Sequence, residues 1–250
     1  MKSLIITVAG LSSRFNRDLD NPVLKCLYHE GNAQSALLSY QISSLYENVD
    51  EIVVVGGFRF ADLEAFCARE ITDPEHKIKL VFNAHYADWG SGYSLICGVD
   101  ALSADSQDVV FLEGDLFFDR PGIQAVVSSC RDVLTVNREV IRSDKAVVLY
   151  VDMEDHPHYI YDTSHAALVI PDPFTAVYNS AQIWKFTRPE RLREIVAALP
   201  PKAVKGTNLE IIQRYFGVLK TSEIEIVSIG NWFNCNTVMD YRQAIKSLIG

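Results

Sequence analysis

The 250 residues are 48% hydrophobic and 22% charged, so we expect one folded domain with a packed core. The 23 Lys and Arg against 32 Asp and Glu give a formal net charge of −9, which argues against a nucleic-acid partner and limits anion binding to a local pocket. No apolar run approaches the roughly 20 residues of a membrane span, and the cysteines form no Cys-x-x-Cys pair. We therefore expect a cytoplasmic protein with no membrane partner, disulfide framework or zinc site.

The first half of the chain alternates predicted strands and helices. Short apolar runs rich in β-branched residues predict strands buried on both faces of a parallel sheet. Apolar stripes at helical spacing separate these runs, as in Leu38, Ile42 and Leu45. This order predicts an α/β fold with a Rossmann-like, doubly wound, mixed but mostly parallel sheet. The predicted strands span 4–8, 51–55, 78–82 and 108–112, and the other two helical stripes lie at 63–67 and 95–102.

Residues 146–186 have a different composition. β-branched and aromatic residues fill four predicted strands, which Asp-His-Pro and Pro-Asp-Pro turns separate. We interpret the region as a β-rich meander laid over the sheet and inserted in a single domain of residues 1–250. The predicted strands of the meander span 147–150, 159–161, 166–170 and 176–186.

Helices dominate the predicted C-terminal part. Thr187 and Glu190 have capping-box spacing and predict a helix start, as do Thr237 and Asp240 further on. We interpret Asp240 as a structural cap rather than a catalytic residue. Between these two helices the sequence predicts a helix at 209–219 and a strand at 223–229.

The loop after the first strand has the composition of an anion-binding loop. Gly10, Ser12 and Ser13 allow backbone N–H groups to surround an anion, and Arg14 and Lys25 supply two cations. A single glycine excludes the dinucleotide fingerprint, and the absence of Gly-Lys-Ser/Thr excludes a Walker A loop. The alternative is a surface loop in which Arg14 and Lys25 occur by chance. The length of the connection favours a phosphate-binding role, because long loops in compact domains are usually functional or disordered.

The fourth predicted strand ends in Gly114-Asp115. A carboxylate at this edge of a parallel sheet lies where ligands bind, and one or two carboxylates suit Mg²⁺. The alternative is a solvated turn, since Gly-Asp is common in turns. Asp119, just before Pro121, is a candidate helix cap.

Polar residues also follow the third predicted strand. Asn83 and Ser94 are candidates for binding a base edge or a phosphate, because short polar side chains at a helix start can do both. The alternative is that Ser91 or Ser94 only caps the following helix.

Several stretches resemble motifs of the nucleotidyltransferase superfamily, in particular its sugar-1-phosphate nucleotidylyltransferases. Residues 4–14 resemble a strand followed by Ala-Gly-x-x-x-Arg, and Gly114-Asp115 resembles the Gly-Asp metal motif. Residues 230–237 resemble a late motif with two acidic or amide positions, which Asn234 and Asn236 occupy here. The Asn-x-x-Tyr…Ser-Leu pattern of 83–95 is most similar to the CTP:phosphocholine and phosphonate cytidylyltransferase branch. The chain departs from the family pattern at the Pro-Lys pair, because two residues separate Pro22 from Lys25.

This resemblance implies a GT-A-like nucleotidyltransferase fold. It also implies Mg²⁺-dependent transfer of a nucleotidyl group, cytidylyl from CTP in this branch, to a small phosphorylated or phosphonate acceptor, with release of pyrophosphate. Arg14, Lys25 and Asp115 would be catalytic, and Asp115 and Asn236 would hold Mg²⁺. Arg14 would neutralise the leaving pyrophosphate, and Lys25 would bridge the α-phosphate and the acceptor. The implied nucleotide-binding residues are Ala9, Gly10, Leu11, Ser12, Ser13, Asn83, Ser94 and Gly114.

The acceptor, the base and the oligomeric state stay open, with a homodimer as one option. An aromatic or acidic lining would suit a phosphorylated amine, although aromatic residues on strands more often belong to the core. His156 and His158 flank a proline and are too close together for a convincing metal set. Two other functions compete: a nucleotide-sugar glycosyltransferase of GT-A type, and a non-catalytic nucleotide-binding relative. The candidates for the acceptor lining are Tyr150, Asp152, Tyr159, Tyr161, Tyr178, Trp184 and Glu210.

Overall fold

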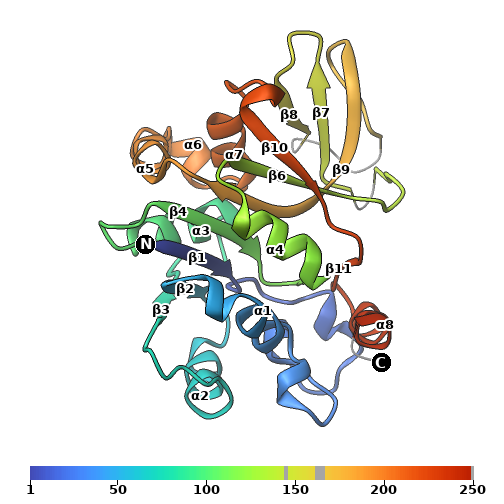
Figure 1. Ribbon diagram of the computed structural model, residues 1–250. Helices are drawn as coiled ribbons and strands as arrows, with labels where there is room; N and C mark the ends of the chain where they lie inside the picture. Colours follow the sequence, from blue (N-terminus) through green and yellow to red (C-terminus); the bar gives the residue numbers. More distant parts are fainter. Residues whose placement is uncertain (144–145, 161–166, 249–250) are drawn as a thin grey trace.

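The computed structural model describes residues 1–143, 146–160 and 167–248 and has a central β-sheet with helices on both faces (Figure 1). The strands are β1 (Lys2–Thr7), β2 (Glu51–Gly56), β3 (Ile78–Phe82), β4 (Asp108–Glu113), β5 (Leu116–Phe118), β6 (Asp132–Asn137), β7 (Val148–Asp152), β8 (Pro157–Ile160), β9 (Phe174–Phe186), β10 (Ile224–Ser228) and β11 (Trp232–Asn234). Seven of them lie side by side in the order β10-β6-β9-β4-β1-β2-β3. All of these are parallel except β9, which pairs antiparallel with β4 and β6. The predicted mixed, mostly parallel α/β sheet is confirmed.

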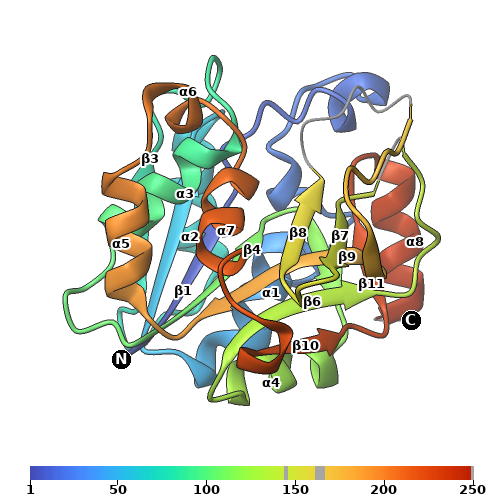
Figure 2. The ribbon, with the colours of Figure 1, turned by 90° about the horizontal axis from the view of Figure 1, so that it is seen from above.

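Helices cover the two faces of this sheet and bury one hydrophobic cluster on each. Leu4 and Ile6 of β1 point into the first cluster, and Ile5 points into the second, as the alternation of a strand requires. The first cluster includes residues of α1, α2, α4 and α8, and the second includes residues of α3, α5 and α7 (Figure 2). The helices are α1 (Leu37–Leu45), α2 (Phe60–Glu70), α3 (Ser91–Asp100), α4 (Arg120–Ser128), α5 (Pro189–Ala197), α6 (Pro201–Val204), α7 (Leu209–Phe216) and α8 (Val238–Leu248), with 3₁₀ turns η1 (Phe15–Asp18), η2 (Lys25–Leu27), η3 (Ala33–Ser35), η4 (Tyr46–Asn48) and η5 (Thr221–Glu223).

The four strands and three helices predicted for the first half are all present. One detail of that prediction is wrong: β3 is the last strand of the sheet and is not buried on both faces. Phe82 at its end is 50% exposed. A short apolar run is compatible with a central strand or with an edge strand, so the sequence pattern did not show which position this strand takes in the sheet.

The predicted meander is only partly correct. β7 and β8 form an antiparallel hairpin that pairs with the first part of β9, and Figure 1 shows these segments rising above the main sheet. The second part of β9 is not laid over the sheet but enters it between β4 and β6. Residues 167–170 have no regular structure, so the strand predicted at 166–170 is wrong there. Ala166 and Tyr161 lie outside the described residues.

Two of the three predicted helix caps are confirmed. Asp119 caps α4 by accepting from Gly122 N at 2.7 Å. Asp240 N donates to Thr237 Oγ1 (3.1 Å) and Thr237 N donates to Asp240 Oδ2 (2.8 Å), so this pair forms the predicted capping box of α8. The box predicted at Thr187 is wrong, because the Thr187 backbone and hydroxyl both donate to the buried Asp132 carboxylate instead.

Three features of the described chain bear on the remaining expectations. β6 and the small antiparallel pair of β5 with β11 were not predicted, and of α4 only the cap at Asp119 was. No helix in the ranges described is long and apolar enough to cross a membrane. All five cysteines are free thiols.

Candidate functional site

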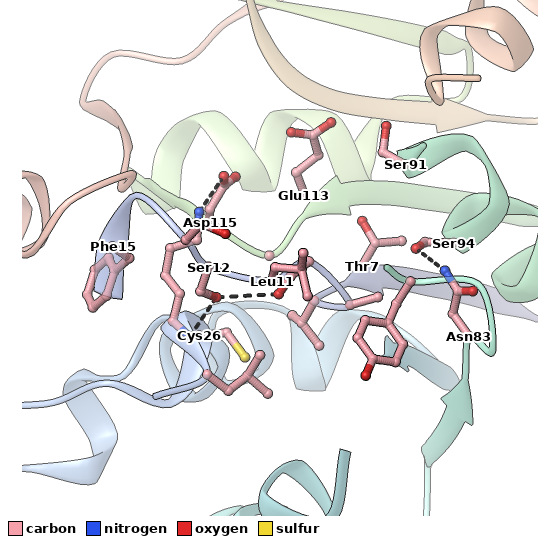
Figure 3. A pocket seen from close by; sticks show the side chains of 18 of the residues that line it. Thr7, Leu11, Ser12, Phe15, Cys26, Asn83, Ser91, Ser94, Glu113 and Asp115 are labelled. Carbon is pink, nitrogen blue, oxygen red and sulfur yellow. Dashed lines mark hydrogen bonds and ion pairs between the residues drawn. The ribbon is translucent and has the colours of Figure 1, made fainter. Parts of the chain in front are cut away.

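A cavity of about 450 Å³ opens at the C-terminal ends of β1 and β4 (Figure 3). This is the edge at which parallel α/β sheets bind ligands. The first loop, the start of α3 and the C-terminal tail contribute its other walls. Every residue predicted for the site lines this cavity: Ala9, Gly10, Leu11, Ser12, Ser13, Arg14, Lys25, Asn83, Ser94, Gly114, Asp115 and Asn236.

The loop of residues 9–15 is anchored at one end and open in the middle. Phe15 is 1% exposed and packs edge-to-face on Tyr28 at 5.1 Å, which fixes the end of the loop. A Cβ on Gly10 would meet no atom within 4 Å. No protein contact therefore demands glycine at position 10, and the space beside it is free for a ligand. The Arg14 side chain is exposed and has no hydrogen-bond or ion-pair partner in the described part of the chain.

A clamp formed by Asn16 explains how Lys25 reaches the cavity despite its displacement from Pro22. Asn16 Nδ2 donates to Val23 O (2.9 Å), and Val23 N donates to Asn16 Oδ1 (2.8 Å). These two hydrogen bonds bring Asn16 and Val23 together, so residues 17–22 form a compact loop between them. Lys25 N then donates to Ser12 Oγ at 3.2 Å, which joins the lysine to the first loop.

Lys25 and Asp115 form an ion pair inside the cavity. Lys25 Nζ lies 2.9 Å from Asp115 Oδ2, and the two side chains are 17% and 19% exposed. The other oxygen, Asp115 Oδ1, is buried and has no hydrogen-bond partner. A buried carboxylate oxygen without a donor has an unmet electrostatic demand that a ligand or a cation can satisfy.

The donor set is compatible with a hard cation such as Mg²⁺. Asp115 Oδ1 offers a charged oxygen, and Asn236 donates through Nδ2 to Asn234 Oδ1 (2.7 Å), which leaves its own amide oxygen for another partner. Both predicted ligands line the same cavity. Among the described residues no group of three or more His, Cys, Asp or Glu side chains could hold a metal ion. Any cation here would therefore need further ligands from a substrate or from water.

Glu113 is a site residue that the sequence did not single out. It lines the cavity two residues before Asp115, half-buried, and Asn208 Nδ2 donates to its Oε1 at 2.7 Å. Burial and then the neighbouring Asp115 charge raise the pKa of Glu113 to about 7, against the opposing effects of Asn208 and Lys25. The available signal was its place in Glu-Gly-Asp, because residues two apart at a strand end share a face. Cys26 also lines the cavity, but burial raises the pKa of its thiol and keeps it protonated.

The wall at the start of α3 is held by close backbone contacts. Gly90 N and Gly92 N donate to the carbonyls of Lys205 (2.9 Å) and Gly206 (3.0 Å), so these N–H groups are not available to a phosphate. Gly90, not a serine, is the N-cap residue of α3, and neither Ser91 nor Ser94 caps the helix. Asn83 Nδ2 donates instead to Ser94 Oγ at 2.9 Å.

None of the described candidates for an acceptor lining reaches this cavity. Trp184 and Tyr159 are core residues, with Trp184 Nε1 donating to the Tyr159 hydroxyl at 2.8 Å. Tyr150 donates to Asp172 at 2.8 Å. Tyr161 lies outside the described residues, and the remaining three are engaged elsewhere: Asp152 with His158, Tyr178 against the second hydrophobic cluster, and Glu210 with Arg214.

Three solved structures with this architecture carry the names of nucleotidyltransferases. The inositol-1-phosphate CTP transferase from T. maritima has a TM-score of 0.68 at 15% identity, covering 99% of this chain and 98% of its own. The CTP:phosphocholine cytidylyltransferase from Streptococcus pneumoniae has a TM-score of 0.65 at 18% identity, with 98% of each chain covered. A Bacillus anthracis protein described as a glucose-1-phosphate thymidylyltransferase has a TM-score of 0.72 at 14% identity, covering 99% of this chain and 95% of its own. The chain thus has the nucleotidyltransferase fold that its motifs implied.

The chain belongs to the family described as "Domain of unknown function (DUF6564)", which matches residues 21–248. No protein of curated function matches it in sequence. The identities to the solved structures are low enough that the likeness establishes the fold alone, and the activity rests on the site.

Proposed function

We propose that the protein is a nucleotidyltransferase that moves a cytidylyl group from CTP to the phosphate or phosphonate of a small acceptor. An acceptor oxygen attacks the α-phosphorus, the bond from that phosphorus to the β-phosphate oxygen breaks, and pyrophosphate leaves. The observation that carries the proposal is the composition of one cavity. It combines the Gly10 loop, the exposed Arg14 and the Lys25–Asp115 pair with its unpartnered oxygen.

The chain's own residues supply charge neutralisation and position, which are what phosphoryl chemistry needs. The backbone of residues 10–13 would bind the β- and γ-phosphates, where Gly10 leaves room for close approach. Arg14 would neutralise the pyrophosphate as it leaves. Lys25, oriented by Asp115, would contact the α-phosphate and the incoming acceptor. No proton acceptor is required, because the nucleophile is already an anion.

Asp115 and Asn236, which line the same cavity, would hold Mg²⁺. When bound there, Mg²⁺ would add positive charge against the triphosphate. Asn236 contributes an oxygen without charge. The proposal therefore assigns most of the protein's share of cation binding to Asp115.

Two alternatives make different predictions. A GT-A-type glycosyltransferase would bind a nucleotide-sugar and release a nucleoside diphosphate, but it gives no role to the exposed Arg14 in the same cavity as Lys25. A non-catalytic relative would bind a nucleotide without turnover. The proposed cytidylyl transfer is supported by the two neighbours named as a CTP transferase and a cytidylyltransferase. The β-rich segment of about 146–186 stays the proposed acceptor region, although none of its described residues lines this cavity.

A pyrophosphate-release screen tests the proposal. Each of the four NTPs with Mg²⁺ is combined with phosphocholine, 2-aminoethylphosphonate, glycerol phosphate, inositol 1-phosphate, sugar 1-phosphates and phosphorylated amino acids. We expect pyrophosphate with CTP and one of these acceptors. CTP binding with no pyrophosphate from any pair would favour the non-catalytic alternative, and release of a nucleoside diphosphate from a nucleotide-sugar would favour the glycosyltransferase.

A further inference from the structure

Gln41 is a residue of α1 that contacts the turn carrying Asp115 from the core. Its side chain is fully buried and does not line the cavity. Gln41 Nε2 donates to Leu116 O at 2.8 Å and to Glu113 O at 3.1 Å. These two carbonyls stand on either side of Gly114-Asp115, so one amide group holds both ends of the turn between β4 and β5.

The contacts fix the direction of this amide and leave its oxygen without a partner. A carbonyl oxygen can only accept, so the NH₂ group of Gln41 must face Glu113 and Leu116. Gln41 Oε1 is buried and accepts no hydrogen bond from the described part of the chain. A buried oxygen without a donor is unfavourable, so an apolar side chain would suit packing better at this core position. What the two N–H groups hold therefore explains a glutamine here, and core packing does not.

Two backbone contacts hold the same turn from other directions. Gly114 N donates to Thr7 O of β1 at 3.0 Å, and a Cβ on Gly114 would lie only 2.7 Å from that oxygen. Cys235 N donates to Asp115 O at 2.8 Å. Cys235 directly precedes Asn236, so this hydrogen bond joins the two segments that carry the proposed Mg²⁺ ligands. The turn is thus held by β1, by the C-terminal tail and by the amide from α1.

The backbone of the turn decides where the oxygens of Asp115 lie, because an aspartate side chain has only two rotatable bonds. Asp115 Oδ2 lies 2.9 Å from Lys25 Nζ, and the buried Oδ1 has no hydrogen-bond partner within the described residues. We propose, as an extension that rests on the proposed nucleotidyl transfer, that Gln41 is a positioning residue that keeps one Asp115 oxygen on Lys25 and the other available to Mg²⁺. Removing a group that orients a metal ligand typically lowers metal affinity or activity by about 10–100-fold.

Gln41→Met tests this role, with Tyr40→Phe as the matched control. Methionine has nearly the same length as glutamine, and it removes both donors together with the unpartnered oxygen. Tyr40 precedes Gln41 in α1 and lies outside the cavity, and its hydroxyl donates to Phe118 O at 2.5 Å, at the other end of β5. Tyr40→Phe therefore removes a hydrogen bond between the same helix and the same strand without changing the contacts of the turn. Gln41→Glu is a second variant, which sets a carboxylate oxygen against the two carbonyls.

Two measurements on the full-length protein report the placement of Asp115. The first is kcat with CTP, Mg²⁺ and the acceptor found in the screen. The second needs no turnover: it is the Kd for CTP by titration calorimetry, once in EDTA and once in excess Mg²⁺. The ratio of these two Kd values shows how much the cation strengthens nucleotide binding. A melting curve for each variant reports its stability.

We expect Gln41→Met to lower kcat about tenfold or more and to bring the Kd ratio toward one, with the Kd in EDTA unchanged. Gln41→Glu should have the larger effect, because its carboxylate repels both carbonyls; if it does not fold, Gln41→Met decides alone. Tyr40→Phe should lower the Tm and leave kcat and the Kd ratio at the wild-type values. The Tm of Gln41→Met should fall less than two lost hydrogen bonds imply, because the unpartnered oxygen is removed with them.

The proposal is overturned if Gln41→Met changes kcat and the Kd ratio no more than Tyr40→Phe does, or if the wild-type ratio is itself close to one. These results are separable from failure of the proposed function. Pyrophosphate release by the wild type, with the same kcat and Kd ratio in Gln41→Met, refutes only the role of Gln41. If the wild type binds CTP and releases no pyrophosphate, nucleotidyl transfer is refuted and the Kd ratio still decides the role of Gln41. Absence of any NTP binding refutes both.

Discussion

The two sides of the cavity are assembled from the chain in different ways. The side that we propose binds the phosphates comes from residues 9–25, which are contiguous and are held together by the two hydrogen bonds between Asn16 and Val23. The opposite side is formed by Glu113 together with Asn208, which is 95 residues further along the chain. In Figure 3 Glu113 and Ser91 lie on one side and Leu11 and Ser12 on the other. The comparison shows that a local loop can be recognised from its own residues, whereas a site wall made by distant contacts cannot.

The largest effect is expected where the two sides meet, at the Lys25–Asp115 pair. Asp115→Asn or Lys25→Ala should lower kcat by about two orders of magnitude or more, because Asp115→Asn removes the charged ligand proposed for Mg²⁺ and Lys25→Ala removes a positive charge beside the reacting phosphates. Steady-state kinetics on the acceptor found in the screen would measure this, with circular dichroism to establish folding. Asp20→Asn is the control, since Asp20 is exposed and does not line the cavity. Near-normal turnover by either cavity variant would contradict the assignment.

Two glycine substitutions, one in the first loop and one at the start of α3, should have opposite effects on nucleotide binding and on stability. Gly10→Ala adds a Cβ with no neighbour within 4 Å, so we expect an unchanged Tm and reduced nucleotide binding. Gly90→Ala places a Cβ 2.2 Å from Gly206 O, so the backbone must move and stability should fall by about 2 kcal/mol. Thermal melting and nucleotide titration of both variants would check this. A lowered Tm in Gly10→Ala, with binding intact, would assign Gly10 a structural role instead.

Asn208 tests whether the distant wall matters for the site. Asn208→Ala removes the donor at 2.7 Å from Glu113 and should cost about 1–2 kcal/mol of stability. Asn208→Asp should cost more, because it sets a second carboxylate against Glu113. Chemical denaturation measures the free energy of unfolding of each variant. Steady-state values of kcat and KM show whether loss of the Asn208–Glu113 hydrogen bond also changes catalysis. Equal stability of the two variants would show that Glu113 does not repel a carboxylate at position 208.

The same contrast of local and distant contacts explains which predictions succeeded. The alternation of apolar runs and helical stripes was enough to predict β1, β2, β4 and the helices between them, because the hydrophobic pattern of each element lies within its own residues. Thr187 had the spacing of a cap, but a tertiary partner, Asp132, binds both its N–H and its hydroxyl. β9 was anticipated as a strand, yet its entry into the sheet depends on strands β4 and β6. Gln182 marks an irregularity there, with φ 57° in the left-handed region.

The smallest effect is expected far from the cavity, in the β7–β8 hairpin. The backbone N–H of His156, together with the His158 side chain and the Glu154 N–H, holds the pKa of Asp152 down at about 2. A carboxylate with a depressed folded-state pKa contributes stability above its unfolded pKa, about 4, and loses it as the pH falls toward 2. The side chain is 20% exposed, and we expect a contribution of about 1–2 kcal/mol at neutral pH. Urea unfolding of wild type and Asp152→Asn between pH 2 and 6 should show a stability difference that is constant above pH 5 and shrinks below pH 4. Nucleotide affinity should be the same in both proteins, because Asp152 does not line the cavity. A stability difference that does not change with pH would mean that packing, and not the charge of this carboxylate, stabilises the hairpin.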